Sequence, residues 1–123
     1  MDKKRILIVD DESHIRLALS RLLSKDYVIF EASNGEEAVS ITREQKPDLV
    51  VMDVMMPKLD GIGACYILKS DIETRRIPIV MLTALADAPD RQYAEEMGAD
   101  AYVSKPCNFK ELMDTINRFL ARS

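Results

Sequence analysis

Short apolar runs alternate along the chain with segments in which apolar residues recur every three or four positions. The runs have the length of strands that are buried on both faces of a sheet. The intervening segments have the spacing of helices packed on one side. This alternation predicts the α/β class, with a parallel sheet covered on both faces, in a single domain spanning residues 1–123. The predicted strands are Arg5–Val9, Tyr27–Phe30, Asp48–Asp53, Pro78–Leu82 and Ala101–Val103.

Five helices are predicted to follow these strands. The last one has the clearest amphipathic pattern, with Phe109, Leu112, Met113, Ile116 and Leu120 on one side. The fourth has few apolar residues, so we expect it to be the least firmly docked. The first helix is expected at about 13–24, the second from a start within 34–37 to a stop near 45–47, the third around 62–68 and the fourth around 90–97.

Composition and charge exclude several kinds of protein. The chain has 17 basic and 21 acidic residues, a net charge of −4, which argues against direct nucleic-acid binding by this domain. No apolar run approaches the roughly 18 residues that span a bilayer, and from the first residues we expect neither a signal peptide nor a membrane anchor. The two cysteines, Cys65 and Cys107, form no paired metal motif. We therefore expect a cytoplasmic protein.

Polar residues follow four of the five predicted strands. Asp10 and Asp11 come after the first, Asp53 ends the third, and Thr83 and Lys105 follow the fourth and fifth. Because the carboxyl ends of parallel strands share one edge of a sheet, we expect these side chains to converge. Asp10 and Asp11 alone could simply cap the next helix. The joint placement at successive strand ends favours a reactive site.

The chemistry of such a cluster is that of phosphoryl transfer. Close carboxylates repel one another unless a cation joins them, and all-oxygen ligands suit Mg²⁺. The Lys105 ammonium and the Thr83 hydroxyl can contact further phosphate oxygens. A carboxylate can itself accept the phosphoryl group, and Asp53 is the candidate for this role.

A series of short motifs, spread over almost the whole chain, resembles the receiver domain of two-component response regulators. Their order along the chain also matches, which makes the resemblance specific. It implies a flavodoxin-like (βα)5 fold with strand order 2-1-3-4-5. The motifs are Ile8-Val9-Asp10-Asp11-Glu12, Asp53-Val54-Met55-Met56-Pro57, Asp60-Gly61, Leu82-Thr83-Ala84, Gly98-Ala99-Asp100 and Lys105-Pro106.

The resemblance implies a phosphorelay function. Asp53 would accept a phosphoryl group from a sensor histidine kinase or a histidine phosphotransfer protein. Asp11 and Asp53 would bind Mg²⁺ or Mn²⁺ directly, Asp10 would act mainly through water, and the backbone carbonyl of Met55 would complete the protein ligands. Such a domain would catalyse only its own phosphorylation and dephosphorylation, so we do not expect an enzyme that turns over outside substrates.

The resemblance also implies a switch. Thr83 and Tyr102 would be the switch pair, and Lys105 would bind the phosphate, with a cis peptide bond between Lys105 and Pro106. Phosphorylation would change the surface formed by the fourth helix, the fifth strand and the last helix. That surface would control an output domain or a protein target, and it is a candidate for a phosphorylation-dependent dimer.

Two other functions compete with this one. A phosphatase or phosphotransferase of the haloacid-dehalogenase-like type needs a second acid two residues after its nucleophile, and Met55 occupies that position. A flavodoxin-like redox protein needs a phosphate-binding loop after the first strand. Asp10 and Asp11 stand at that place and would repel a phosphate. Within the receiver family, the long connection Ser70–Ile77 and the alanine at Ala101 favour a stand-alone or non-DNA-binding output.

Overall fold

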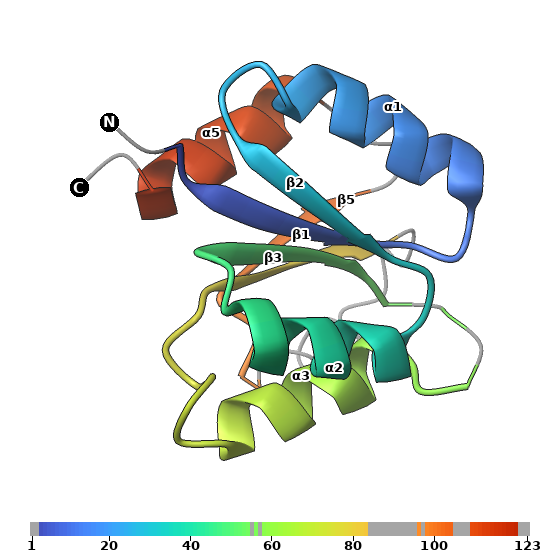
Figure 1. Cartoon of the computed structure of the whole chain (residues 1–123), viewed down its shortest axis with the longest axis vertical. Coiled ribbons are helices and arrows are strands. Elements are labelled where there is room, and N and C mark those ends of the chain that lie inside the picture. Colours follow the sequence, from blue (N-terminus) through green and yellow to red (C-terminus); the bar gives the residue numbers. More distant parts are fainter. Residues whose placement is uncertain are drawn as a thin grey trace.

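The computed structural model describes residues 3–54, 56, 58–83, 96, 98–104 and 109–120. A five-stranded parallel sheet lies between two layers of helices (Figure 1). Its strand order is β2-β1-β3-β4-β5, which confirms the predicted order 2-1-3-4-5. The strands are β1 (Arg5–Val9), β2 (Val28–Ala32), β3 (Leu49–Asp53), β4 (Ile79–Thr83) and β5 (Ala101–Ser104).

Four helices cover the two faces of the sheet. Helices α1 (Ser13–Leu23) and α5 (Phe109–Leu120) pack on one face, and α2 (Gly35–Gln45) and α3 (Gly61–Ser70) pack on the other. The helix predicted near 90–97 lies almost entirely outside the described residues. Within the described part of the chain, no helix has both the length and the hydrophobicity needed to cross a membrane.

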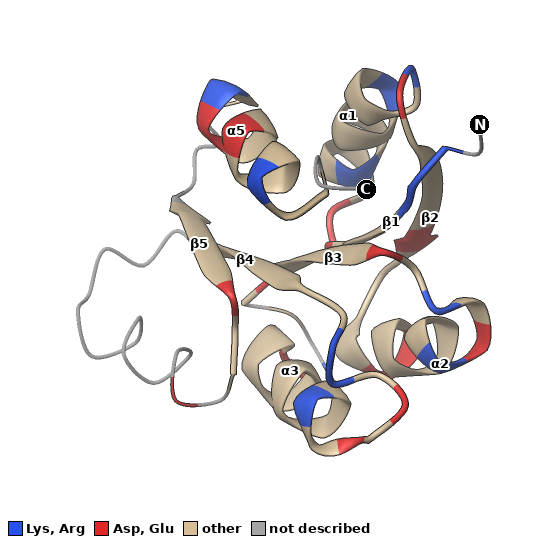
Figure 2. Cartoon of the chain, turned by 90° about the vertical axis from the view of Figure 1, so that its left-hand side faces the viewer, with Lys and Arg blue, Asp and Glu red and all other residues tan. Residues whose placement is uncertain are grey.

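The core has two halves, one on each face of the sheet. Alternate residues of β1 and β3 enter opposite halves: Ile8 and Val51 face α1 and α5, whereas Val9 and Met52 face α2 and α3. All five residues of β3 are buried. Charged residues lie mainly on helices and connections, and β4 carries none (Figure 2). This two-sided burial explains why the central strands read as continuous apolar runs in the sequence.

The edge strand β2 differs most from its prediction. It begins one residue later than expected and continues through Glu31 and Ala32. Glu31 ends the apolar run, but it lies on an exposed edge strand, where its carboxylate accepts a bond from Arg16 Nε at 3.3 Å. A polar residue is therefore tolerated inside this strand. The ends of the other strands differ from the predictions by at most one residue.

Side-chain caps fix where α2 and α3 begin. Asn34 Oδ1 accepts the Glu37 N–H at 2.9 Å, and Asp60 Oδ1 accepts the Gly63 N–H at 2.7 Å. Each cap satisfies a backbone donor that the helix itself leaves unpaired, and such caps typically contribute about 1 kcal/mol. The Asp60 cap sets the first residue of α3 at Gly61, next to the end of β3.

Cys65 belongs to α3, and its side chain is buried in the core. Burial raises the pKa of its thiol to about 11. In a Cys107→Ser background, we expect the folded protein at about pH 8 to react with iodoacetamide more than about tenfold more slowly than the protein unfolded in urea. Intact-mass spectrometry measures the rate. Equal rates in the two states would contradict the buried position.

The same shift predicts a pH dependence of stability. Because the folded-state pKa lies above the ordinary value of 9.0, the contribution of the neutral thiol is complete below that value and is lost as the pH rises through about 11. We therefore expect the urea midpoint of the Cys107→Ser protein to fall more steeply over this range than that of the Cys65→Ala, Cys107→Ser double variant.

Candidate functional site

Two buried acidic residues follow adjacent positions of two neighbouring strands at the carboxyl edge of the sheet. Val9 of β1 is in register with Met52 of β3, so Asp10 and Asp53 are the next residues on two adjacent strands. Asp10 is 0% exposed and Asp53 is 4% exposed. Taking a carboxylate out of water is costly, so two of them at neighbouring strand ends indicate a site with a chemical role. The two residues thus follow neighbouring positions of the backbone, and the convergence of the five predicted side chains stays a prediction.

A compact acidic group surrounds Asp10. Asp10, Asp11 and Glu12 each have one carboxylate oxygen that lies within 4.8 Å of those of the other two. Glu12 was not predicted as a site residue, although it belongs to the motif that follows β1. It joins the group because the chain turns sharply there, with the Glu12 N–H donating to Asp10 Oδ1 at 3.0 Å. Asp53 is not a member of this group.

The junction between β1 and α1 is held from two directions. The Asp10 N–H donates to the Ala32 carbonyl of β2 at 3.2 Å. From α1, Arg16 Nη1 donates to the Asp10 carbonyl at 2.7 Å, while its Nε contacts Glu31 at 3.3 Å. The Arg16 side chain is 20% exposed, so these bonds are partly shielded from water. They fix the backbone that carries the acidic group.

Close packing against α3 fixes the backbone at Asp53. The Gly61 N–H donates to the Val54 carbonyl at 3.0 Å. A Cβ atom at Gly61 would lie 2.1 Å from the Asp53 carbonyl oxygen, which no side chain can occupy without moving the backbone. Gly61 is therefore required by a close approach of two backbone segments. The Asp60-Gly61 motif thus helps to fix the position of the Asp53 backbone.

The remaining predicted residues come from β4 and β5. Thr83 is the last residue of β4 and is in register with Ser104. Tyr102 of β5 is partly buried and packs against the core half beneath α2 and α3. Met55, Lys105 and Pro106 lie outside the described residues, so the backbone ligand, the phosphate-binding amine and the cis peptide bond stay predictions.

Comparison with known proteins identifies the family. The model of the response regulator receiver domain matches residues 6–117. The chain belongs to this family. The match includes the acidic group after β1 and the end of β3, so the receiver domain accounts for both the sheet topology and the buried carboxylates.

One curated relative illustrates how the receiver domain is used. The chain is 50% identical over 122 residues to the probable transcriptional regulator ycf27 of Porphyra purpurea. The alignment covers 98% of this chain but 49% of the relative. The chain therefore spans about half the length of the curated regulators that it matches.

Two solved structures show the same fold. The signal receiver domain of a signal transduction histidine kinase from Syntrophus aciditrophicus has a TM-score of 0.90 at 35% identity, covering 98% of this chain and 94% of that one. The receiver domain of the sensor histidine kinase PA1611 from Pseudomonas aeruginosa has a TM-score of 0.89 at 29% identity, covering 98% and 99%. The second structure contains a magnesium ion coordinated in its active site cleft.

The contact at Gly61 makes a testable prediction. We expect Gly61→Ala to lower the free energy of unfolding by about 2 kcal/mol or more, because the new methyl group meets backbone atoms that cannot turn aside. Urea titration followed by circular dichroism measures this change.

Gly63→Ala is the matched control. Its added methyl group first meets Leu59 Cδ1, the end of a flexible side chain, at 2.8 Å. Because alanine also favours the helix, the change should stay within about 1 kcal/mol of zero. Equal losses for the two variants would show that the approach of Gly61 to Asp53 is not the determining contact.

Proposed function

We propose that Asp53 is the phosphorylation site of this receiver domain. The observation that supports this most is its position: a carboxylate 4% exposed, at the end of a fully buried central strand, beside the acidic group that follows β1. The phosphoryl donor is a phosphohistidine of a sensor histidine kinase or of a histidine phosphotransfer protein. The domain changes only its own phosphorylation state and is not an enzyme for outside substrates.

The reaction is an in-line displacement at phosphorus. A carboxylate oxygen of Asp53 forms the new O–P bond, the N–P bond of the phosphohistidine breaks, and the released imidazole nitrogen takes up a proton. Positioning of the nucleophile is the main contribution of the protein to such a transfer. The register of β3 with β1 and the approach of Gly61 provide that positioning.

The acidic group fits a divalent cation. Its members offer hard carboxylate oxygens, and one oxygen from each of Asp10, Asp11 and Glu12 lies within 4.8 Å of those of the other two. Such donors suit Mg²⁺ or Mn²⁺. We propose that Asp10, Asp11, Asp53 and the Met55 carbonyl hold the cation, with Asp10 acting mainly through water. When bound, the cation neutralises charge on the phosphoryl oxygens.

The phosphorylated state is read through β4, β5 and the elements beside them. Thr83 and Lys105 contact phosphate oxygens only if they move, and Tyr102 changes its orientation with Thr83. The surface that responds includes β5 and α5 together with residues 84–97. It binds an output domain, a protein target or a second copy of the domain.

Control of transcription is the output that the relatives support. The ycf27 proteins are named transcriptional regulators, and their identity to this chain extends over the whole receiver domain. The long Ser70–Ile77 connection and Ala101 favour a stand-alone output, but each concerns only a small part of the chain. We therefore propose that the domain controls a separate DNA-binding unit and does not itself contact nucleic acid.

Phosphorylation can be tested directly. Incubation with acetyl phosphate and Mg²⁺ should add one phosphoryl group, detected by intact-mass spectrometry, and hydroxylamine should remove it because the product is an acyl phosphate. EDTA should abolish the reaction.

Asp53→Asn is the control, because it keeps the shape of the side chain and removes the nucleophile. It should gain no phosphoryl group while its circular dichroism spectrum stays unchanged. Labelling of the variant at the wild-type rate would contradict the assignment. Repeated turnover of p-nitrophenyl phosphate would instead support the haloacid-dehalogenase-like alternative.

The switch surface makes a second prediction. We expect phosphorylation to change amide hydrogen exchange across residues 84–104 and in α5, because these segments form the surface that responds to the new charge. Exchange in β1 and β3 should change little. Exchange mass spectrometry with and without acetyl phosphate measures this difference. Unchanged exchange across residues 84–104 in fully phosphorylated protein would refute the proposed surface.

A further inference from the structure

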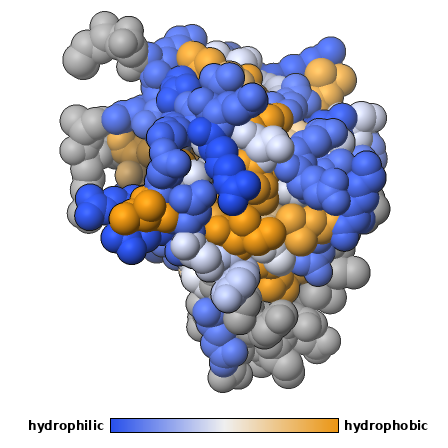
Figure 3. Space-filling view, turned by 60° about the horizontal axis from the view of Figure 1, so that its bottom comes forward, coloured by the Kyte–Doolittle hydropathy of each residue, from blue (hydrophilic) through white to orange (hydrophobic). Residues whose placement is uncertain are grey.

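A groove of about 570 Å³ lies at the carboxyl-terminal ends of α2 and α3. Two of its apolar side chains are exposed: Tyr66 by 56% and Ile72 by 75%. Ile72 is the most exposed large apolar side chain in the described part of the chain. On the face formed by α2 and α3, apolar side chains reach the surface between charged ones (Figure 3). The groove is lined by Arg43, Tyr66, Ile67, Ser70, Asp71 and Ile72.

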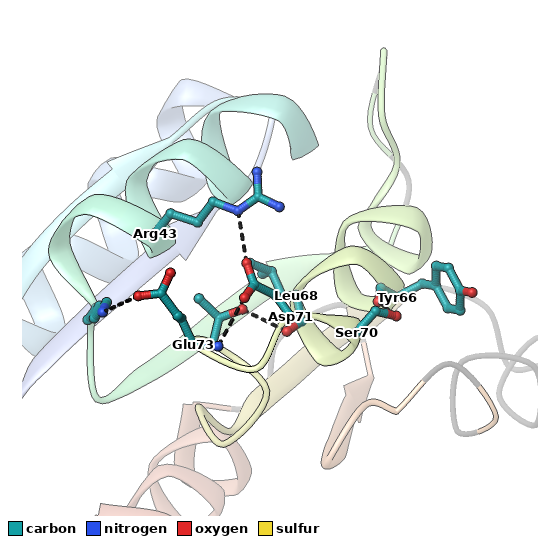
Figure 4. A network of polar contacts seen from close by, with 8 residues as sticks. Arg43, Tyr66, Leu68, Ser70, Asp71 and Glu73 are labelled. Carbon is teal, nitrogen blue, oxygen red and sulfur yellow. Dashed lines mark hydrogen bonds and ion pairs between the residues drawn. The ribbon is translucent and has the colours of Figure 1, made fainter.

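Ion pairs hold the wall of this groove in place. Asp71 accepts the Glu73 N–H at 2.9 Å and Arg43 Nε at 3.2 Å, which joins α2 to the turn after α3. The bond from the Glu73 backbone and the Arg43 guanidinium both lower the pKa of Asp71, so its carboxylate stays charged. Lys46 pairs with Glu73 at 3.2 Å. Figure 4 shows these contacts, with the Tyr66 ring pointing away from them.

Buried bonds order the turn that carries Ile72. Thr74 is 0% exposed, and its hydroxyl donates to the Leu68 carbonyl at 2.7 Å. Lys69 Nζ donates to the Arg75 and Ile77 carbonyls at 3.1 and 2.8 Å. The same ammonium pairs with Asp100 at 2.8 Å. Ile72 is thus presented to solvent on an ordered turn, which lowers the entropic cost of binding a partner there.

The charge beside the groove is positive. Arg43 and Lys46 are matched by Asp71 and Glu73. The next two cations in the turn, Arg75 and Arg76, are exposed, and neither guanidinium pairs with an acid among the described residues. The turn that carries Ile72 therefore also offers two exposed guanidinium groups, which are complementary to carboxylates next to an apolar group.

This surface is separate from the phosphorylation site. Ser70 ends α3, and the turn after it leads to Ile79 at the start of β4. It therefore lies at the amino edge of the parallel sheet, whereas Asp10 and Asp53 lie at the carboxyl edge. The groove takes part neither in the proposed phosphorylation at Asp53 nor in the surface that we propose to respond to it.

We propose that the groove and its arginines bind an acidic amphipathic segment of a partner protein. An apolar side chain of that segment packs against Ile72 and Tyr66, and its carboxylates contact Arg75 and Arg76. A protein segment fits better than a membrane, because the ion pair of Arg43 and Asp71 lines this shallow surface and would lose its water beneath acyl chains.

A peptide selection tests the proposal without a known partner. Short random peptides displayed on phage are selected on the complete chain after depletion on its Ile72→Ser variant. We expect the recovered peptides to combine acidic and large apolar residues. Their affinity, measured by fluorescence anisotropy, should fall at least about tenfold with Ile72→Ser and with Arg75→Glu, Arg76→Glu, and should weaken with added salt.

Matched variants control for general effects. Leu22→Ser is the control for Ile72→Ser, because it removes an apolar side chain of 47% exposure from α1. Arg21→Glu together with Lys25→Glu is the control for the double arginine variant, because it makes the same change in net charge at another place. Both should bind the peptides like the unchanged chain, and circular dichroism should show all variants folded. Failure to recover peptides, peptides without acids, or equal binding by the groove variants would overturn the proposal. So would Ile72-dependent binding to phosphatidylglycerol vesicles without peptide binding.

Discussion

The burial of β3 on both faces is the constraint on which the site depends. Its apolar residues alternate between the two halves of the core, so a slip of one residue would place each of them on the wrong face. Neighbouring strands on both sides hold its register. Asp53 therefore has one position available to it, at the edge of the sheet. A strand that is fixed in this way holds the backbone of Asp53 at one place on the edge of the sheet.

That position has a thermodynamic cost. Asp10 and Asp53 are almost fully buried, and taking a carboxylate out of water is costly. The fold accommodates the acids because the surrounding backbone is tightly fixed, by Arg16 and Ala32 at Asp10 and by Gly61 at Asp53. The apolar core stabilises the fold, so the residues at the strand ends need not contribute to its stability. A site with these acids would favour the binding of a cation, which suits the phosphoryl transfer that we propose.

The central strands could be predicted because they follow from local patterns, whereas the strand order came from the resemblance to the receiver family. Continuous apolar runs identify β1 and β3, and the motifs at their ends identify the family. Glu12 was missed because the position of its carboxylate depends on how the chain turns from β1 into α1. The end of β2 was missed because an edge strand tolerates a charged residue that a central strand does not.

The exposure of Ile72 could not be predicted for a related reason. An isoleucine in a polar turn could equally contribute to the core, and its orientation depends on contacts between segments far apart in sequence. Arg43 comes from α2, Thr74 reaches back to Leu68, and Lys69 joins the turn to Asp100. The polar residues of the turn form these bonds to the rest of the chain, and Ile72 is left exposed to solvent.

The two ends of the sheet consequently differ in character. Helices in this fold run antiparallel to the strands they follow, so helix carboxyl ends gather at the edge opposite the strand carboxyl ends. One edge carries buried acids, and the other carries Ile72 with two exposed arginines. A partner bound at the second edge, as we propose, would leave the edge that carries Asp53 uncovered. The two proposed functions are therefore compatible, because the two edges of the sheet are separated by the length of its strands.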